Sequence, residues 1–249
     1  MVPNQGPPIA GPAKSPARIA AMFDAIADRY DFLNHVLSAG IDRRWRRRAV
    51  RSLRLTGRET VLDVCTGTGD LAIAAIQGSP GSPGARRVVG VDFAGEMLRV
   101  AFAKLQHHAL DRRIALARGD AARIPVGDGA VDAVTIAFGI RNVEDTRAAC
   151  REMARVLKPG GRLAILEFAV PTLPVIRPIY LWYFRHVLPR IGRLVSRHTA
   201  AYGYLPASVD AFATPDEFVT ILRQSGFAGI SAVPLSWGIV FLYTGRRDA

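Results

Sequence analysis

A short glycine-rich segment offers the clearest chemistry in the sequence. Residues 66–70 read Thr-Gly-Thr-Gly-Asp and follow an apolar, β-branched run over 60–65. Glycines at the end of a strand let a ligand approach the backbone closely. The spacing is not that of a P-loop, which ends in Gly-Lys-Ser/Thr, and Ala72 replaces the third glycine of a strict GxGxxG fingerprint. The segment therefore predicts a ligand site without defining the ligand.

Acidic residues end the next two expected strands. Asp92 closes a strand over 87–92, and Asp120 closes one over 113–120, just before Ala121. A carboxylate at the first position accepts hydrogen bonds from a ribose diol, and ligands of open α/β sheets bind beyond the carboxyl ends of the strands. Asp120 suits an adenine amino group, with the backbone N–H of Ala121 free beside it. Together these positions predict one nucleoside ligand, although Asp92 as an ordinary turn residue is the alternative.

Two nucleoside cofactors, NAD and S-adenosylmethionine, fit this pattern. NAD needs room for a pyrophosphate at a helix N-terminus. Here that N-terminus carries Asp70, whose negative charge opposes a phosphate, whereas a cationic sulfonium or amino group is favoured near Asp63 and Asp70. Charge therefore favours S-adenosylmethionine. The candidate cofactor residues are Asp63, Gly67, Gly69, Asp92, Asp120 and Ala121.

Strands and helices alternate through the middle of the chain. We expect strands over 60–65, 87–92, 113–120, 131–138 and 162–168, and helices over 70–77, 96–106 and 146–157. This alternation indicates a parallel sheet with helices on both faces. A helix near 214–225 and antiparallel strands near 228–234 and 238–245 complete a seven-stranded, Rossmann-like α/β fold. One helix from Pro16 past Tyr30 and a second over 41–54 precede the sheet as a cap.

The length and composition fit one enzyme domain. The chain has 249 residues, of which 49% are hydrophobic, and two cysteines, which exclude a disulfide scaffold or a four-cysteine zinc module. We expect a proline-rich disordered tail over 1–16 and a single domain over 17–249, with a helical cap at 17–56 and a helical insert or lid at 171–213. No apolar run suits a transmembrane helix or a secretory signal, so the expected location is the cytoplasm.

Arginine dominates the charge. The formal net charge is +12, and the 33 basic residues include only three lysines. Seven of the arginines lie within 41–54, and more lie in the aromatic and basic insert. Such a charge favours an anionic partner, while a composition bias without a partner is the alternative. Because the cofactor loops are acidic or neutral, we expect anionic membrane rather than nucleic acid, with a homodimer surface or simple packing as alternatives for the insert.

Longer segments resemble a known family. VLDVCTGTGD, GDAARIPVGDGAVDAV and EMARVLKPGGRL are similar to class I S-adenosylmethionine-dependent methyltransferases. More specifically, MFDAIADRYDFLNHVLSAGIDRRW, AFGIRNVED, ILEFAVP, HVLPRIG and YGYLPASVDAF resemble the ubiquinone/menaquinone biosynthesis C-methyltransferase family. The resemblance runs from about residue 18 to 247, and its segments occur in family order.

The resemblance implies a cofactor site and a reaction. Cofactor contacts fall on Thr68, Asp92 and Asp120-Ala121, while Ala137 stands where some members have serine. The implied reaction is methyl transfer from S-adenosylmethionine to a ring carbon of a polyprenylated quinol, with demethylmenaquinol preferred over the benzoquinol precursor of ubiquinone. The implied catalytic residues are Arg141, Asn142 and Tyr30, without a metal. Asp31, Tyr202 and Tyr204 are further candidates to contact the ring or line its pocket.

Several alternatives stay open at this stage. Arg141 pairing with a carboxylate such as Glu144, and Tyr30 serving only in packing, are the structural explanations for two of these residues. An RNA-directed methyltransferase would explain the charge, but no RNA-binding module is recognisable. An NAD-dependent reductase lacks the Tyr-x-x-x-Lys pair that it would need. The five histidines show no metal-ligand spacing.

Overall fold

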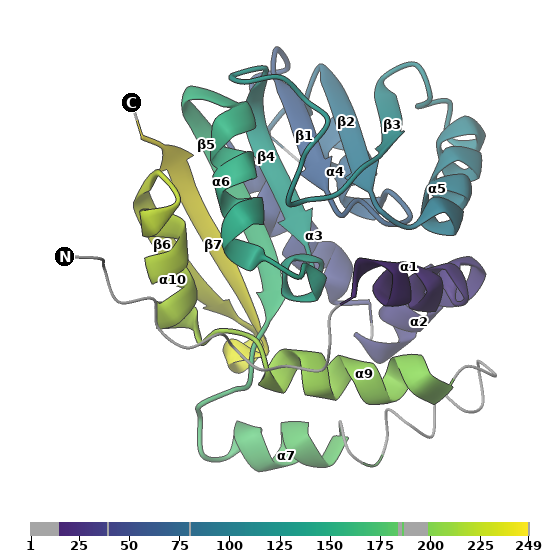
Figure 1. The fold of residues 1–249 in the computed structure, drawn as a ribbon, viewed down its shortest axis with the longest axis vertical. Helices are drawn as coiled ribbons and strands as arrows, with labels where there is room; N and C mark the ends of the chain where they lie inside the picture. Colours follow the sequence, from purple (N-terminus) through teal and green to yellow (C-terminus); the bar gives the residue numbers. More distant parts are fainter. Residues whose placement is uncertain (1–14, 39, 80, 184–185, 187–198, 249) are drawn as a thin grey trace.

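Seven strands form one sheet in the order β3-β2-β1-β4-β5-β7-β6 (Figure 1). The computed structural model describes residues 15–38, 40–79, 81–183, 186 and 199–248. The strands are β1 Thr60–Val64, β2 Arg87–Asp92, β3 Ile114–Arg118, β4 Val131–Ala137, β5 Leu157–Phe168, β6 Phe227–Leu235 and β7 Val240–Arg247. β7 pairs antiparallel with β5 and β6, and the other neighbours pair parallel. The predicted mostly parallel sheet with an antiparallel last strand is confirmed.

Side chains alternate along the central strands between two hydrophobic cores, as the pleat of a strand requires. Leu62 joins the core beneath α6 (Thr146–Val156) and α10 (Pro215–Gln224). Its neighbour Val61 joins the core on the opposite face, beneath α3 (Asp42–Ser52) and α4 (Asp70–Gln77). Leu105 of α5 (Gly95–His107) packs in this second core. Helices therefore cover both faces, as the alternation of strands and helices predicts.

Three helices cover the edge at which the parallel strands end (Figure 1). They are α1 (Pro16–Asp24), α2 (Ala27–Leu37) and α9 (Thr199–Asp210), and α7 (Ile176–Trp182) lies beyond α9. Among the described residues, no helix is long and apolar enough to cross a membrane. The cap and the insert thus meet over the carboxyl ends of the strands, although they are far apart in sequence.

Three predicted boundaries differ from the structure. The helix expected from Pro16 past Tyr30 is two helices, because the chain turns at Ala25 and Ile26. Neither residue is a helix breaker; the turn lets Phe23, Ile26 and Tyr30 pack together around Met97 of α5. β5 begins at Leu157 rather than at residue 162, and its pairing with β4 shifts between these positions. Of the predicted tail, residues 1–14 lie outside the described residues, and Pro16 already belongs to α1.

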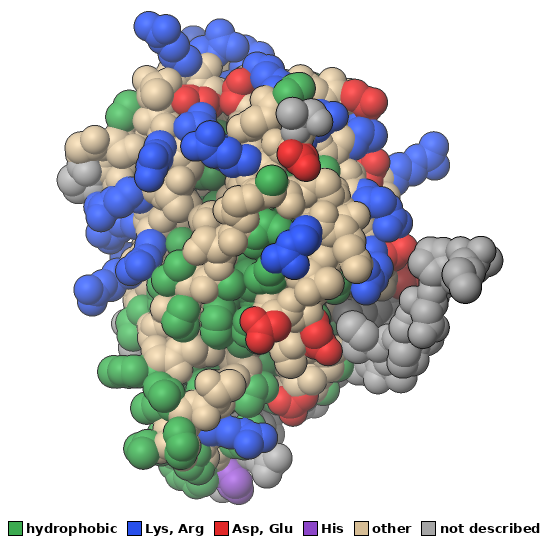
Figure 2. Space-filling view, turned by 90° about the vertical axis from the view of Figure 1, so that its left-hand side faces the viewer, with side chains coloured by type: hydrophobic (Ala, Val, Ile, Leu, Met, Phe, Trp, Pro, Cys, Tyr) green, Lys and Arg blue, Asp and Glu red, His purple; other side chains and the backbone are tan. Residues whose placement is uncertain are grey.

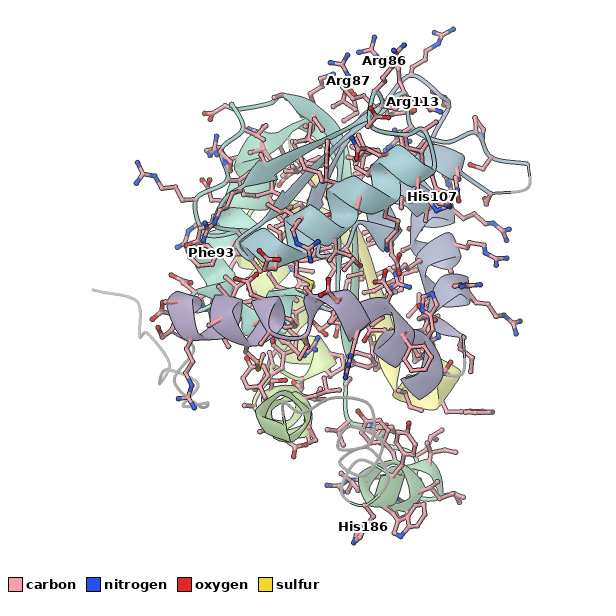
Figure 3. The ribbon with its side chains drawn as sticks, turned by 90° about the vertical axis from the view of Figure 1, so that its right-hand side faces the viewer. Arg86, Arg87, Phe93, His107, Arg113 and His186 are labelled. Atoms are coloured by element: carbon pink, nitrogen blue, oxygen red, sulfur yellow. The ribbon has the colours of Figure 1, made fainter. Side chains whose placement is uncertain are left out.

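The positive charge is more widely spread than the sequence analysis expects. Figure 3 shows Arg86, Arg87 and Arg113 at the edge of the sheet opposite the cap. On α3 most arginines are exposed, but Arg46 is only 7% exposed. The arginines of the insert at 185, 190, 193 and 197 lie outside the described residues. The charge therefore does not mark one face, and Arg46 stands apart from the rest.

One aromatic cluster fixes α3 on the sheet. Trp45 lies edge-on to Phe138 and Phe168, whose rings stack with centroids 4.5 Å apart. The indole Nε1–H of Trp45 donates to the Ser236 hydroxyl at 3.0 Å. Because Phe138 directly follows β4, this cluster couples the cap to the loop that carries the predicted catalytic residues.

Replacing Trp45 with alanine should therefore destabilise the whole domain. Loss of a buried tryptophan leaves a large cavity and is expected to reduce the free energy of unfolding by about 3–5 kcal/mol. Ser236→Ala removes only the hydrogen bond and should cost about 1 kcal/mol. Urea unfolding followed by circular dichroism measures both values. If Trp45→Ala reduces the free energy of unfolding by no more than Ser236→Ala does, the aromatic cluster does not hold the cap.

Candidate active site

The glycine loop after β1 has the unusual backbone that its sequence allows. Cys65, Gly67 and Gly69 have φ of +51°, +55° and +83°, which is the left-handed region. Gly69 caps α4 in this conformation, and its N–H donates to the Thr66 carbonyl at 2.9 Å. A Cβ on Gly139 would lie 2.4 Å from the Cβ of Cys65. The loops after β1 and β4 are therefore packed directly against each other.

Asp92 connects the glycine loop to the end of β2. Its carboxylate accepts the backbone N–H of Gly67 at 2.7 Å and that of Ala94 at 2.9 Å. Burial raises the pKa of Asp92, while these backbone hydrogen bonds oppose that effect. Each carboxylate oxygen has a second lone pair available. Asp92 can thus hold the loop and still accept hydrogen bonds from a ligand hydroxyl.

Asp63 plays a more structural part than its charge suggests. It is 1% exposed, and its two oxygens accept the hydroxyls of Thr66 at 2.6 Å and Thr135 at 2.7 Å. Burial raises the pKa of the Asp63 carboxyl to about 6, although both hydroxyl hydrogen bonds lower it. The side chain therefore braces the base of the glycine loop against β4.

A cavity of about 220 Å³ opens at the carboxyl ends of β1 to β4. Four of the predicted cofactor residues line it: Gly67, Asp92, Asp120 and Ala121. Asp120 accepts the N–H of Ala122 at 2.9 Å, which fixes its carboxylate at the rim. Phe93, Met97 and Phe23 contribute apolar wall. Four acids also line the cavity: Asp92 at the end of β2, Asp120 after β3, and Glu144 and Asp145 after β4. Asp92 and Asp120, beside the apolar wall, suit a ribose and an adenine.

A smaller cavity of about 30 Å³ adjoins the first on the side of α4. Asp63, Thr68, Asp70 and Arg46 line it, and Tyr30 lines both cavities. Burial raises the pKa of Tyr30, so its hydroxyl stays protonated at neutral pH and can donate a hydrogen bond. The predicted cofactor residues thus line two adjoining cavities, except Gly69, which lines neither. Tyr30 of α2 is shared by both linings.

Charged contacts hold the cap on the glycine loop. The hydroxyl of Thr68 and the ammonium of Lys104 both donate to Asp31 of α2. Lys104 also contacts Asp70 at 2.7 Å. Thr68 is 2% exposed, so its hydroxyl is committed to Asp31 in this structure. Asp31, a candidate for contacting the quinol ring, is likewise occupied by Thr68 and Lys104.

Arg141 and Asn142 lie in the turn after β4 but face different surroundings. The Arg141 guanidinium is buried, donates to Glu167 at 2.6 Å and to the Phe138 carbonyl at 2.6 Å, and lies over the Phe168 ring. It pairs with Glu167 rather than with Glu144. Asn142 lines the large cavity, and the Tyr204 hydroxyl donates to its side-chain oxygen at 3.1 Å. The side chain of Tyr202 lies outside the described residues.

Sequence reasoning missed three residues of this site. Glu167, fully buried, is the partner of Arg141, and Lys104 joins the cap to α4. Arg46 reaches the small cavity from α3, whose arginines the prediction assigned to an anionic membrane and not to the cofactor. Ligand atoms of His35, Asp42 and Asp70 lie within 4.8 Å of one another. Arg46 contacts both of those carboxylates, which gives the cluster a cation of its own.

Comparison with known proteins gives matches along most of the chain. The ubiE/COQ5 methyltransferase family model matches residues 13–247. The chain is 49% identical over 227 residues to the ubiquinone/menaquinone biosynthesis C-methyltransferase UbiE of Syntrophotalea carbinolica, covering 91% of this chain and 93% of that protein. It is 44% identical to the demethylmenaquinone methyltransferase of Thermus thermophilus, covering 91% of this chain and all of that protein.

Solved structures agree on the fold. An S-adenosylmethionine-dependent methyltransferase from Thermotoga maritima superposes with a TM-score of 0.64 at 16% identity, covering 92% of this chain and all of that one. The [4+2]-cyclase SpnF superposes with a TM-score of 0.69 at 17% identity, covering 99% and 100%. These likenesses concern architecture alone. Together with the family match over nearly the whole chain, they confirm the predicted fold and resemblance: the chain belongs to the ubiE/COQ5 methyltransferase family.

Proposed function

We propose that this protein transfers a methyl group from S-adenosylmethionine to a ring carbon of a polyprenylated quinol, with demethylmenaquinol as the substrate. The observation that carries the proposal is the cavity at the carboxyl ends of β1 to β4, where Asp92, Asp120 and Asn142 line an otherwise largely apolar space. Relatives named for demethylmenaquinone and for ubiquinone/menaquinone biosynthesis support the ring substrate. The benzoquinol precursor of ubiquinone is the second candidate.

The chain's own residues fit the methyl donor. Asp92 would accept the ribose hydroxyls, and Asp120 with the backbone of Ala121 would meet the adenine. Gly67 would let the ligand lie against the loop, because a side chain there would need a left-handed backbone. Bound in this way, S-adenosylmethionine supplies an electrophilic methyl group. Asp63 would act behind the loop, since its oxygens are occupied by Thr66 and Thr135.

Asn142 and Tyr30 are the groups that we assign to the quinol. Both line the large cavity, and both carry donors for an oxygen on the ring. Arg141 acts as a positioning residue, because its guanidinium is held by Glu167 and by the Phe138 carbonyl and thereby fixes the turn that presents Asn142. Methylation forms a carbon–carbon bond as the carbon–sulfur bond breaks, which leaves S-adenosylhomocysteine. The ring carbon then loses its proton to water, which restores the aromatic ring.

Asp92→Ala should weaken S-adenosylmethionine binding by about 10- to 100-fold, because a charge-assisted hydrogen bond contributes about 1.5–3 kcal/mol. Isothermal titration calorimetry measures the dissociation constant. Asp111→Ala changes an exposed acid remote from the cavity and is the matched control. Thermal unfolding of both variants separates binding from folding. An affinity equal to that of the wild type in a folded Asp92→Ala variant would refute the site.

Methyl transfer should require the reduced ring. With methyl-labelled S-adenosylmethionine, demethylmenaquinol should gain one labelled methyl group, detected by mass spectrometry. Oxidised demethylmenaquinone should gain none, because its ring carbon is not nucleophilic. The benzoquinol precursor of ubiquinone is assayed in parallel. A faster rate with that compound would reverse the substrate preference, and no transfer to either quinol would overturn the proposed reaction.

We further propose that the protein works in the cytoplasm at the inner face of the cell membrane, on a substrate whose prenyl chain lies in lipid. Hydrophobic side chains gather in the lower part of Figure 2, where Figure 1 places α7. The exposed apolar residues of this region are Leu173, Val175, Ile179, Trp182 and Trp237. Pro171 approaches Gly238, and Tyr180 packs with Ile239, so the 3-10 turn Ser236–Gly238 adjoins α7. Exposed tryptophan and aliphatic residues beside Arg177 suit a lipid interface.

The double variant Ile179→Ser, Trp182→Ser should bind vesicles of phosphatidylglycerol and phosphatidylcholine at least about tenfold more weakly than the wild type, because each apolar side chain contributes about 1.5–3 kcal/mol on burial. Phe102→Ser removes an exposed phenylalanine of α5 and should change nothing. Vesicle co-sedimentation measures binding. Unchanged co-sedimentation of the double variant would show that this surface does not bind lipid. If the variant instead loses a dimer that the wild type forms in solution, the surface is a dimer interface.

A further inference from the structure

The small cavity beside the glycine loop contains an arginine to which the reaction gives no role so far. We propose that Arg46 binds the α-carboxylate of the methionyl part of S-adenosylmethionine and so sets the position of the methyl donor. This inference rests on the proposed function, with the cofactor placed across the two adjoining cavities. It places one residue of α3 in the cofactor site, although most arginines of this helix are exposed to solvent.

Arg46 differs from its neighbours in burial. It is 7% exposed, whereas Arg43, Arg44, Arg47 and Arg48 are exposed to solvent. A buried guanidinium is costly unless anions compensate it. Its position on α3, one residue after Trp45 and four before Val50, turns it towards the core and the small cavity. Burial at this point therefore places one fixed positive charge next to the glycine loop.

The guanidinium keeps one edge available. Its contacts with Asp42 and, at 3.4 Å, with Asp70 both use Nη1. Among the described residues, Nε and Nη2 have no hydrogen-bond partner, yet the side chain lines the cavity. The Nε–Nη2 edge of an arginine is a planar fork that matches the two oxygens of a carboxylate. The geometry therefore suits a third carboxylate, supplied by a ligand, on the cavity side.

The charges around the cavity match an amino acid group. The methionyl end carries one carboxylate and one ammonium, so it needs a cation and an acceptor close together. Arg46 supplies the cation, and Asp70 and Asp63 line the same cavity on the side of the loop. Asp70 does not compensate Arg46 alone, because the same carboxylate also contacts Lys104. Tyr30 lines both this cavity and the large one.

A ligand without the carboxylate tests the contact directly. We compare binding of S-adenosylmethionine and of decarboxylated S-adenosylmethionine to the wild type, to Arg46→Gln and to Arg47→Gln, using calorimetry. The wild type should prefer the carboxylated ligand by about tenfold or more, the value of one charge-assisted pair. Arg46→Gln should lose that preference, because the substitution weakens the binding of S-adenosylmethionine and leaves the affinity for the decarboxylated ligand nearly unchanged. Arg47→Gln, the exposed neighbour, should behave as the wild type.

The outcomes separate this contact from the rest of the site. Equal losses for both ligands in Arg46→Gln, or no loss for either, would overturn the role of Arg46. If Arg46→Gln does not unfold cooperatively on heating, the wild type alone decides, because equal affinity for the two ligands contradicts the proposal. Failure of the cofactor site itself would instead appear as unchanged binding in Asp92→Ala.

Discussion

The site depends on one half-buried carboxylate that joins two strands. Asp92 ends β2, yet it accepts a hydrogen bond from Gly67, which lies in the loop after β1. A loop with three left-handed residues has few regular hydrogen bonds of its own, so this contact and that of Thr66 with the Val91 carbonyl determine its course. The same carboxylate is the group that we assign to the ribose. Loop conformation and ligand binding are therefore coupled through a single side chain.

The cap extends this coupling to the rest of the enzyme. Asp31 receives both the Thr68 hydroxyl and the Lys104 ammonium, and Arg46 spans Asp42 and Asp70. These pairs are largely shielded from water, where removing one partner costs more than forming the pair gains. The cap is thus held by charge over the glycine loop and by the Trp45 cluster over the loop after β4. A quinol and a methyl donor would meet between these two attachments.

Much of the fold could be predicted from the sequence, because short apolar, β-branched runs and glycine-rich turns are local signals. The positions of the strands along the chain and the acids at their ends follow from the same signals, but the order of the strands within the sheet does not. The partners of buried charges could not be predicted. Glu167 and Arg141 are 26 residues apart and meet only through the sheet. Arg46 had one usable signal: residues 46, 50 and 53 share a helical face with apolar neighbours, which distinguishes it from the exposed arginines. The turn between α1 and α2 carries no local signal, since packing on α5 imposes it.

A crystal structure with S-adenosylhomocysteine tests the central claim most directly. The account predicts density for the adenosine in the large cavity, with both ribose hydroxyls within hydrogen-bond distance of Asp92 and the adenine beside Asp120 and Ala121. The homocysteine carboxylate should lie against the Nε–Nη2 edge of Arg46. Adenosine density away from the carboxyl ends of β1 to β3, or a ribose that makes no contact with Asp92, would contradict it.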